Sequence, residues 1–375
     1  MTGGRLRIAQ LAPPFETVPP LKYGGTERVI WALTEELVRR GHEVTLFASG
    51  DSRTSAKLVP IVERAVWHHP RYELGLPFVA MALDGLYDRC RDFDVIHNHD
   101  QLLALPMARR HPETPTVSTL HGRLDLPEYQ PLFAHFDDAP LVSISDSQRR
   151  PVPHANWLGT VYNGLPVEQF PFVAEARPYL AFVGRISPEK GVDTAIRVAR
   201  RAGLPIKLAA RMPLQEANNA EARRDWDYYD AIVKPLLAEP GVEYLGELGD
   251  ADKAELVGNS LALLFPIRWP EPFGLVQIEA LACGTPVLAL RCGSTPEVIE
   301  HGRTGFVQDH EDELVEAVGR IGSIRRAECR VAVERRFSAR AMADGYERMY
   351  AFALGTGTPY AATRIEATWV APIAR

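Results

Sequence analysis

The sequence predicts an α/β protein with two doubly wound, Rossmann-like domains that face each other across a cleft. The length of 375 residues favours two domains, each large enough to bury its own core. In both halves, short apolar segments alternate with helix-like segments, a pattern typical of parallel sheets covered on both faces. The alternation restarts near residue 179, after a stretch rich in turn-forming residues.

The N-terminal half contains five strand-like segments. We expect these strands at residues 6–11, 43–48, 94–97, 116–120 and 141–144. A loop rich in proline and glycine follows the first strand. Thr26 is then suited to cap a helix that runs to Arg40 and stops at Gly41. Further helix patterns lie between the other strands, so consecutive strands are expected to pair in parallel.

The C-terminal half repeats the same alternation. Strands are expected at residues 179–185, 206–209, 242–245, 261–265 and 286–290. The turn-rich residues 163–178 would join the halves. We therefore predict an N-terminal domain over residues 1–170 and a C-terminal domain over residues 171–354. A long helix at 338–354 would end the second domain, followed by an irregular tail at 355–375.

Composition and charge exclude several classes of partner. The net charge is −6, with acidic and basic residues spread along the chain, so no nucleic-acid partner is expected and there is no strong membrane signal. No segment reaches the roughly 20 apolar residues of a membrane span, and the apolar run at 8–12 is too short for a signal peptide. The four cysteines form no C-x-x-C pair, as is typical of a reduced, cytoplasmic protein.

The segment at residues 269–280 carries the strongest functional signal. It places two carboxylates, Glu271 and Glu279, at the start of an expected helix directly after a buried strand; Pro272 suits the first helical turn. Eight helical positions span about 12 Å, too far for a shared acid–base pair but suited to two ends of an extended polyol. Because carboxylates repel phosphates, we expect both to bind hydroxyl groups. A surface helix with acidic residues in its first turn is the simpler alternative.

Two glycine-containing loops are candidates for binding an anion. In the first, Gly24 and Gly25 lie between a strand and a helix, where backbone N–H groups can approach a phosphate or a sugar. They are not part of a G-x-G-x-x-G fingerprint, so a dinucleotide site is not indicated, and a plain turn is equally compatible.

The second loop combines a helix start with two cations. Ser187 is suited to cap a helix with Pro188 at its first position, and Arg185 and Lys190 flank that end. Two cations at a positive helix end suit a diphosphate, which we favour over two solvated charges.

Polar residues also follow strands of the first half. His121 comes directly after one strand and could contact a ligand hydroxyl, although a lone histidine is more often structural. Ser143, Ser145 and Asp146 end the next strand and could line the same cleft or cap a helix. The His-Asn-His-Asp run at residues 97–100 looks like a metal cluster, but residues alternating along a strand rarely form a tetrahedral site. We therefore expect no metal there.

Four motifs together resemble one enzyme family. They are Tyr23-Gly24-Gly25-Thr26-Glu27-Arg28, Val183-Gly184-Arg185 with Glu189-Lys190-Gly191, Glu271-Pro272-Phe273-Gly274 with Glu279, and Gly284-Thr285-Pro286-Val287. In order and spacing they resemble the retaining glycosyltransferase family 4, whose fold is GT-B. Residues 12–20 further resemble a subgroup that includes an avilamycin-biosynthesis glycosyltransferase. The resemblance implies a last helix that packs back on the N-terminal domain.

The resemblance also implies how a nucleotide-diphospho-sugar donor would be held. Arg185 and Lys190 would bind the diphosphate, with Gly24 and Gly25 approaching it from the other domain. Glu279 would bind the ribose hydroxyls. Because the two cations can stabilise the leaving diphosphate, the reaction would need neither a metal nor another cofactor.

At the other end of the donor, Glu271 and the backbone of Phe273, Gly274 and Leu275 would hold the transferred hexose and the distal phosphate. His121 would contact the same sugar. The residues expected to take part in catalysis are Glu271, His121, Lys190 and Arg185. Retention without a carboxylate nucleophile implies front-face attack by the acceptor.

The sequence departs from the family in one loop. Relatives often carry Gly-x-Gly where this chain has residues 209–213, so the base is open; UDP is preferred, with GDP and ADP possible. The charged segment 215–229 could form a lid. The acceptor, a sugar, small aglycone or glycolipid, would contact residues 52–76 and 124–138. A sugar-nucleotide epimerase and a non-catalytic nucleotide-sugar-binding protein are the alternatives.

Overall fold

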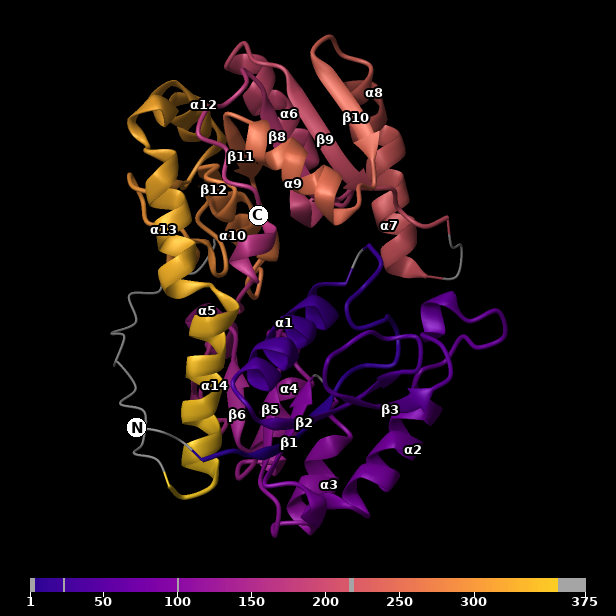
Figure 1. Ribbon diagram of the computed structural model, residues 1–375. Coiled ribbons are helices and arrows are strands. Elements are labelled where there is room, and N and C mark those ends of the chain that lie inside the picture. The colour runs from indigo at the N-terminus through magenta and orange to yellow at the C-terminus, as the bar shows by residue number, and fades with distance from the viewer. Residues whose placement is uncertain (1–3, 23, 100, 216–218, 357–375) are drawn as a thin grey trace.

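The computed structural model describes residues 4–22, 24–99, 101–215 and 219–356. It contains two parallel sheets, one in each half of the chain, each with helices packed against it (Figure 1). The first sheet has seven strands in the order β3-β2-β1-β4-β5-β6-β7. Its strands are β1 (Arg7–Leu11), β2 (Glu43–Ser49), β3 (Lys57–Val62), β4 (Val95–His99), β5 (Thr116–Thr119), β6 (Leu141–Ser143) and β7 (Trp157–Thr160).

The helices of the first half connect these strands in the order of the chain. They are α1 (Gly25–Arg39), α2 (Leu76–Tyr87), α3 (Ala104–Arg110), α4 (Tyr129–His135) and α5 (Asp146–Arg149), with 3-10 turns η1 (Val66–His68), η2 (Cys90–Asp92) and η3 (Val167–Gln169). Helix α1 buries one apolar stripe, which includes Val29, Leu33 and Leu37, against the sheet. The opposite face of the sheet is covered by α2, whose Leu83 and Leu86 are buried there.

The second sheet has six strands in the order β10-β9-β8-β11-β12-β13. Its strands are β8 (Leu180–Arg185), β9 (Ile206–Arg211), β10 (Val242–Gly246), β11 (Ala262–Phe265), β12 (Val287–Leu290) and β13 (Gly305–Gln308). The connecting elements are η4 (Pro188–Lys190), α6 (Val192–Arg201), α7 (Ala220–Tyr228), the π-helical η5 (Tyr229–Val233), α8 (Lys234–Leu237), α9 (Asp250–Asn259), α10 (Leu275–Ala282), α11 (Thr295–Val298), α12 (Glu311–Arg320), η6 (Ile321–Ser323) and α13 (Arg326–Arg336). The two doubly wound sheets confirm the predicted fold class.

Strand order reverses once in each sheet, between β1 and β4 in the first and between β8 and β11 in the second. In parallel α/β sheets, ligands bind at such switch points, outside the carboxyl ends of the strands. The candidate donor-site residues before α10 lie at the end of β8 or in the segments that follow β1, β5, β8 and β11, up to Gly25, the first residue of α1. The topology therefore brings both switch points to the region between the two halves (Figure 1).

The chain crosses between the halves twice at one place. Leu165 N donates to Phe337 O at 2.8 Å, and Ala339 N donates to Leu165 O at 2.7 Å. After the second crossing, α14 (Ala339–Ala353) packs along α1, where Arg40 pairs with Asp344 and Glu347 (Figure 1). The predicted domain boundary at 170/171 falls between the last strand of the first sheet and the first strand of the second.

Three strands that the sequence did not predict are β3, β7 and β13. Each is the edge strand of its sheet. An edge strand needs only one pairing partner and tolerates exposed side chains and proline, as Pro60 shows in β3. The apolar alternation that marks a central strand is therefore weak there. Residues 52–76, expected as an acceptor loop, contain β3 and η1 in addition to loop.

Three helix starts were predicted wrongly. Gly24, not Thr26, is the N-cap of α1, and no side chain caps that helix. Ser187 makes no capping hydrogen bond, because residues 188–190 form a 3-10 turn and α6 begins only after Gly191, at φ 70°. Pro272 lies outside α10, which begins at Leu275 after Gly274, at φ 75°. In the last two cases a glycine in the left-handed region separates the loop from the helix.

Two predicted segments lie partly outside the described residues. In residues 215–229, α7 begins at Ala220, and residues 216–218 lie outside the described part, so the lid remains a prediction. Most of the tail, 357–375, lies outside it as well. Over the described ranges, the helices are too short or too polar to cross a bilayer. All four cysteines are free thiols.

Candidate active site

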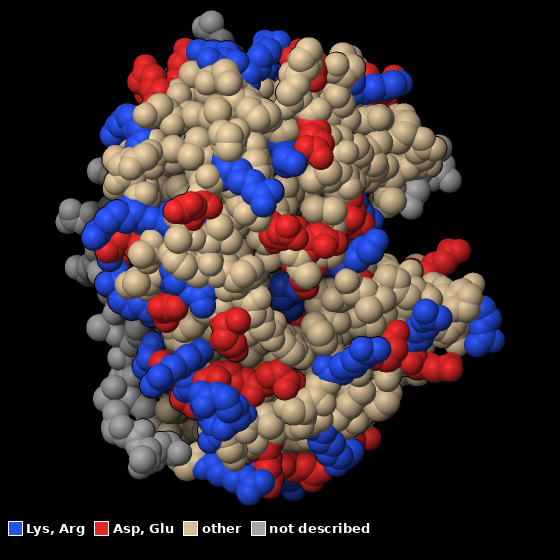
Figure 2. Space-filling view, turned by 45° about the horizontal axis from the view of Figure 1, so that its top comes forward, with Lys and Arg blue, Asp and Glu red and all other residues tan. Residues whose placement is uncertain are grey.

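A cleft of about 740 Å³ separates the two halves, and residues from both line it. Figure 2 shows the molecule notched between its upper and lower parts, with acidic and basic residues interspersed over the visible face. The lining includes every candidate donor-site residue, namely Gly24, Gly25, His121, Arg185, Lys190, Glu271, Phe273, Gly274, Leu275 and Glu279. Residues from five separate loops and helices thus meet at one place.

Lys190 and Glu271 form an ion pair in this cleft. Lys190 ends the turn after β8, and Glu271 lies in the loop between β11 and α10; the Lys190 ammonium donates to Oε2 of Glu271. The indole N–H of Trp269 donates to the same oxygen at 2.9 Å, and the ammonium lies 5.5 Å from the centre of the Trp269 ring. The pair is mostly buried, so an anion that binds Lys190 has to compete with Glu271 for the ammonium.

Arg185, at the end of β8, also has acidic neighbours. Its guanidinium donates to Glu189 at 2.9 Å and lies 3.4 Å from Glu221 and 3.9 Å from Asp225. Burial raises the pKa of Asp225 above its ordinary value. Because Glu221 and Asp225 belong to α7, the segment predicted as a lid contacts one of the two cations expected to bind a diphosphate.

Glu279 lies one turn into α10 and is only 5% exposed. Lys253 of α9 donates to both of its carboxylate oxygens, at 2.9 and 3.0 Å, and also pairs with Asp250 at 3.3 Å. Asp250 in turn pairs with Arg28 of α1, across the cleft. The sequence analysis assigned no role to either basic residue. Lys253 belongs to no motif, and Arg28 ends the first motif, but nothing in that motif indicates its partner.

The loop that carries Glu271 is fixed from behind by residues 292–294, which follow β12. Ser294 N donates to Glu271 O at 3.1 Å, and its hydroxyl donates to Phe273 O at 2.7 Å. Gly293, at φ 57°, packs so closely that a Cβ would overlap the backbone N and O of Glu271. Gly293 and Ser294 are therefore supporting residues that sequence reasoning missed. A glycine three residues after the end of a buried strand was the available signal.

Ser145 and Asp146 join the two halves and do not line the cleft. The Ser145 hydroxyl accepts from Gln148 N, which caps α5, and donates to Pro272 O at 2.6 Å. The backbone N–H groups of Asp146 and Ser147 donate to Glu297 at 2.7 Å. Burial raises the pKa of Glu297. The helix-cap interpretation of Ser145 is thus confirmed, with an added contact between the halves.

His121 is the cleft-facing end of a buried chain of hydrogen bonds. Its Nε2 lies 3.0 Å from Nδ1 of His99, and Nε2 of His99 lies 2.6 Å from Oε1 of Gln10. An amide oxygen only accepts, so His99 carries its proton on Nε2 and accepts on Nδ1 from His121. In the neutral state His121 therefore presents Nδ1 as the nitrogen with a lone pair.

His97 continues the network toward α14. Its Nδ1 lies 2.7 Å from the Tyr350 hydroxyl, and its Nε2 lies 2.8 Å from the Thr119 hydroxyl. Burial lowers the pKa values of His97 and His99 well below their ordinary value, and neighbouring histidines add to the effect. Each ring contacts a neighbouring side chain at both nitrogens, and the absence of a metal at residues 97–100 stays a prediction. Asp100 lies outside the described residues.

Comparison with known proteins agrees with this geometry. Residues 168–332 match the model for glycosyl transferases group 1, and residues 23–157 match that for glycosyltransferase family 4. Glycogen synthase of Mycobacterium tuberculosis is 27% identical, over 76% of this chain and 79% of its own length.

Two solved structures share the fold over most of both chains. AviGT4, a glycosyltransferase involved in avilamycin A biosynthesis, has a TM-score of 0.67 and 23% identity, covering 93% of this chain and 98% of its own. HepE from Anabaena, solved with UDP-glucose, has a TM-score of 0.66 and 18% identity, covering 94% of this chain and 100% of its own.

Two facing Rossmann-like domains, the lined cleft between them and the matched models define a glycosyltransferase with the GT-B fold, which uses a nucleotide-sugar donor. The two models together cover most of the sequence. The chain belongs to glycosyltransferase family 4.

Proposed function

We propose that this enzyme transfers a hexose, with retention and without a metal ion, from a UDP-sugar to a hydroxyl group of an acceptor. The observation that carries the proposal is the convergence of Arg185, Lys190, Glu271 and Glu279 on one cleft. Two cations suit the two phosphates, and two carboxylates suit the hydroxyl groups on either side of them. GDP- and ADP-sugars are the alternative donors.

In this proposal, Lys190 and Arg185 bind the diphosphate and stabilise its charge as the sugar–phosphate bond breaks. Phosphate binding releases Lys190 from Glu271, and the freed carboxylate accepts hydrogen bonds from the sugar hydroxyls. The backbone at residues 273–275 holds the distal phosphate, and Gly25 approaches from the other half. A Cβ on Gly25 would lie 3.5 Å from Leu275, so little space remains between the halves there.

Glu279 and His121 hold the two ends of the donor. Glu279 accepts from the ribose hydroxyls, for which its contact with Lys253 keeps the carboxylate in place. His121 accepts a hydrogen bond from a hydroxyl group of the transferred sugar on Nδ1, because its Nε2 donates to His99. Deprotonation of the acceptor falls to a donor phosphate oxygen in front-face attack, a step for which the family resemblance is the support.

The acceptor is proposed to bind along the N-terminal wall of the cleft. That wall includes Phe15, Trp67, Leu124 and Tyr129, and Trp67 is 58% exposed. The rings of Phe15 and Trp67 lie 6.0 Å apart. Aromatic faces suit the apolar side of a sugar ring or a small aglycone. A sugar or small aglycone is therefore preferred over a glycolipid.

A thermal-shift screen of nucleoside diphosphates and their sugars tests the donor assignment. A ligand that binds the native state raises the melting temperature, so UDP and one UDP-sugar are expected to stabilise the protein most. The matched Lys190→Ala variant should lose most of that stabilisation. If no nucleotide changes the melting temperature of the wild-type protein, the donor assignment is wrong.

Turnover distinguishes the remaining alternatives. Slow release of free UDP from the UDP-sugar, abolished in Lys190→Ala, is expected of a transferase acting on water in place of its acceptor. A non-catalytic binding protein would release none. Conversion of the UDP-sugar to its epimer, with no acceptor present, would establish the epimerase instead.

A further inference from the structure

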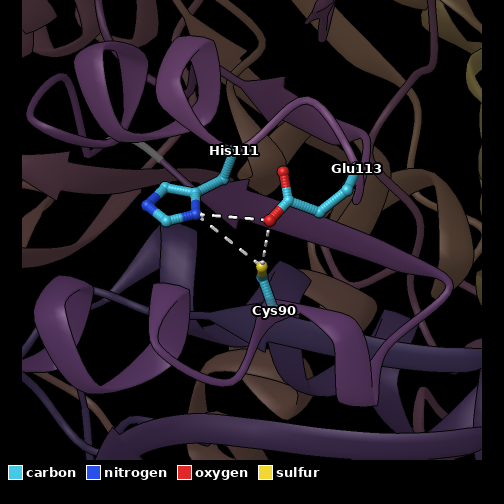
Figure 3. A group of neighbouring side chains, drawn as sticks. All are labelled: Cys90, His111 and Glu113. Carbon is cyan, nitrogen blue, oxygen red and sulfur yellow. Dashed lines mark hydrogen bonds and ion pairs between the residues drawn. The ribbon is translucent and has the colours of Figure 1, made fainter.

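A thiol, an imidazole and a carboxylate, those of Cys90, His111 and Glu113, meet in the first half of the chain (Figure 3). Cys90 belongs to η2, just before β4, while His111 and Glu113 follow α3, just before β5. The cluster therefore lies at the amino-terminal ends of strands whose carboxyl ends reach the cleft. None of the three residues lines the cleft.

The three potential ligand atoms form a nearly equilateral triangle. His111 Nδ1 lies 3.9 Å from Cys90 Sγ and 3.7 Å from Glu113 Oε1, and Cys90 Sγ lies 3.7 Å from Glu113 Oε1. The nitrogen–oxygen separation is too long for a hydrogen bond. The Cys90 thiol donates to Glu113 Oε1 and also contacts His111 Nδ1, and His111 and Glu113 form a long ion pair, so the three side chains point at a common centre (Figure 3).

The size of this triangle matches a metal ion. Its centre lies about 2.2 Å from each of the three atoms, and zinc binds Cys, His and Asp or Glu at about 2.0–2.3 Å. Tetrahedral coordination at those bond lengths needs ligand atoms about 3.3–3.6 Å apart, so a contraction of a few tenths of an ångström completes the geometry. A fourth, solvent-side position is available to water, because His111 and Glu113 are partly exposed.

We propose that Cys90 Sγ, His111 Nδ1 and Glu113 Oε1 bind one Zn²⁺ ion, with water as the fourth ligand. On binding, the Cys90 thiol loses its proton to solvent, His111 coordinates as the neutral imidazole protonated on Nε2, and Glu113 coordinates as the carboxylate. A mixed sulfur, nitrogen and oxygen donor set suits zinc better than the hard cations Mg²⁺ and Ca²⁺.

The ion would join two segments that are already in contact. The Thr114 hydroxyl donates to Cys90 O at 2.9 Å, which ties the segment before β5 to η2. Arg91 Nε lies 3.6 Å from Glu113, but its side chain is 83% exposed and can turn away into solvent. The role of the site is therefore to stabilise this part of the N-terminal half. The ion takes no part in sugar transfer.

The test uses the full chain, stripped of metal with a chelator and kept reduced by a non-thiol phosphine. Zinc titration should show one equivalent bound to the wild type and to the control Cys292→Ser. In Cys90→Ser and Glu113→Gln, zinc affinity should fall by about 100-fold or more. Zinc at about 100 times its dissociation constant should raise the wild-type melting temperature by about 3 °C, and Cys90→Ser should lose that rise.

Two further readouts keep the result independent of protein stability. Co²⁺ in place of zinc should give a thiolate-to-metal charge-transfer band in the wild type and in Cys292→Ser, but none in Cys90→Ser. Arg91→Gln should bind zinc at least as tightly as the wild type, because it removes a neighbouring positive charge. The proposal is overturned if the wild type binds no zinc, or if Cys90→Ser and Glu113→Gln bind it as the wild type does.

Discussion

Nδ1 of His99 accepts a hydrogen bond from Nε2 of His121 over 3.0 Å. It can do so because the other ring nitrogen of His99, Nε2, donates its proton to Gln10 Oε1 over 2.6 Å. A residue on β1 thereby sets the tautomer of a histidine in the cleft through one intervening ring. Gln10 and His99 do not line the cleft, and both are completely buried. They are positioning residues for His121.

Removing the Gln10 carbonyl should therefore change catalysis more than donor binding. In Gln10→Leu, His99 loses the acceptor that fixes its tautomer, and kcat should fall by about 10-fold with little change in the KM for the donor. The tautomer of His121, read by nitrogen NMR, should become mixed. Tyr346→Phe, which removes a hydroxyl bonded to Thr119 in the same network, is the control and should leave the tautomer intact. An unchanged tautomer in Gln10→Leu would refute the positioning role.

The buried histidines should make the protein sensitive to acid. His97 and His99 have native-state pKa values far below that of an unfolded histidine, about 6.5, so below that pH only the unfolded state takes up their protons. The free energy of unfolding that these two neutral rings contribute is fully present above pH 6.5. It is lost as the pH falls below that value, by about 1.4 kcal/mol per pH unit for each ring. Urea unfolding between pH 7.5 and 5 measures the slope. His97→Gln should reduce it by one proton equivalent, and an identical slope would contradict the assignment.

Glu271 and Glu279 should have separable kinetic effects. Glu279→Ala removes the contact proposed for the ribose and should raise the donor KM by about 10-fold or more, with little change in kcat. Glu271→Ala should lower kcat as well, because its carboxylate is proposed to hold the reacting sugar. Steady-state kinetics with varied donor separate the two, and the reverse pattern would invert the proposed orientation of the donor.

Competition for Lys190 gives a further expectation. Glu271→Gln removes the charge that pairs with the Lys190 ammonium, so free UDP should bind at least as tightly as in the wild type while sugar transfer falls. Calorimetric titration of UDP measures this directly. Weaker UDP binding in Glu271→Gln would show that Glu271 supports the diphosphate site and does not compete with it.

Gly293 should be needed for the shape of the donor loop. Gly293→Ala carries the cost of a left-handed residue, about 1–2 kcal/mol, and a clash with the backbone of Glu271. Gly302→Ala is the matched control, because Gly302 has φ 78° and a Cβ added there would have no atom within 4 Å. Both variants should be destabilised, but only Gly293→Ala should also lose kcat. Equal kcat values would mean that the close packing does not fix Glu271.

The sequence predicted the structure well where residues form a buried parallel strand or a loop that depends on glycine. Central strands such as β8 and β11 are continuous apolar runs, and the residues at their carboxyl ends are necessarily neighbours in space. That is why the order of strands and loops along the chain is enough to assign Arg185, Lys190 and Glu271 to one cleft.

The predictions that were wrong or missing concern positions where the local sequence constrains the structure only weakly. The edge strands β3, β7 and β13 need no strict apolar pattern, and the starts of α6 and α10 depend on the conformation of Gly191 and Gly274 rather than on a capping side chain. Lys253 reaches Glu279 from another helix, a contact that only tertiary packing determines. The tautomer chain from Gln10 to His121 is of the same kind, because it depends on which side chains meet across the sheet.

Gly164 has no side chain, and this allows the two connections between the domains to lie in direct contact, since a Cβ there would overlap Ser338 O. Both connections therefore act as one pivot, tied by the hydrogen bonds of Leu165. We therefore expect any relative movement of the two halves to be a rotation about this point, with displacements that grow with distance from it. The Arg28–Asp250 ion pair joins the two halves at a distance from this point, so we expect a rotation that opens the cleft to break it.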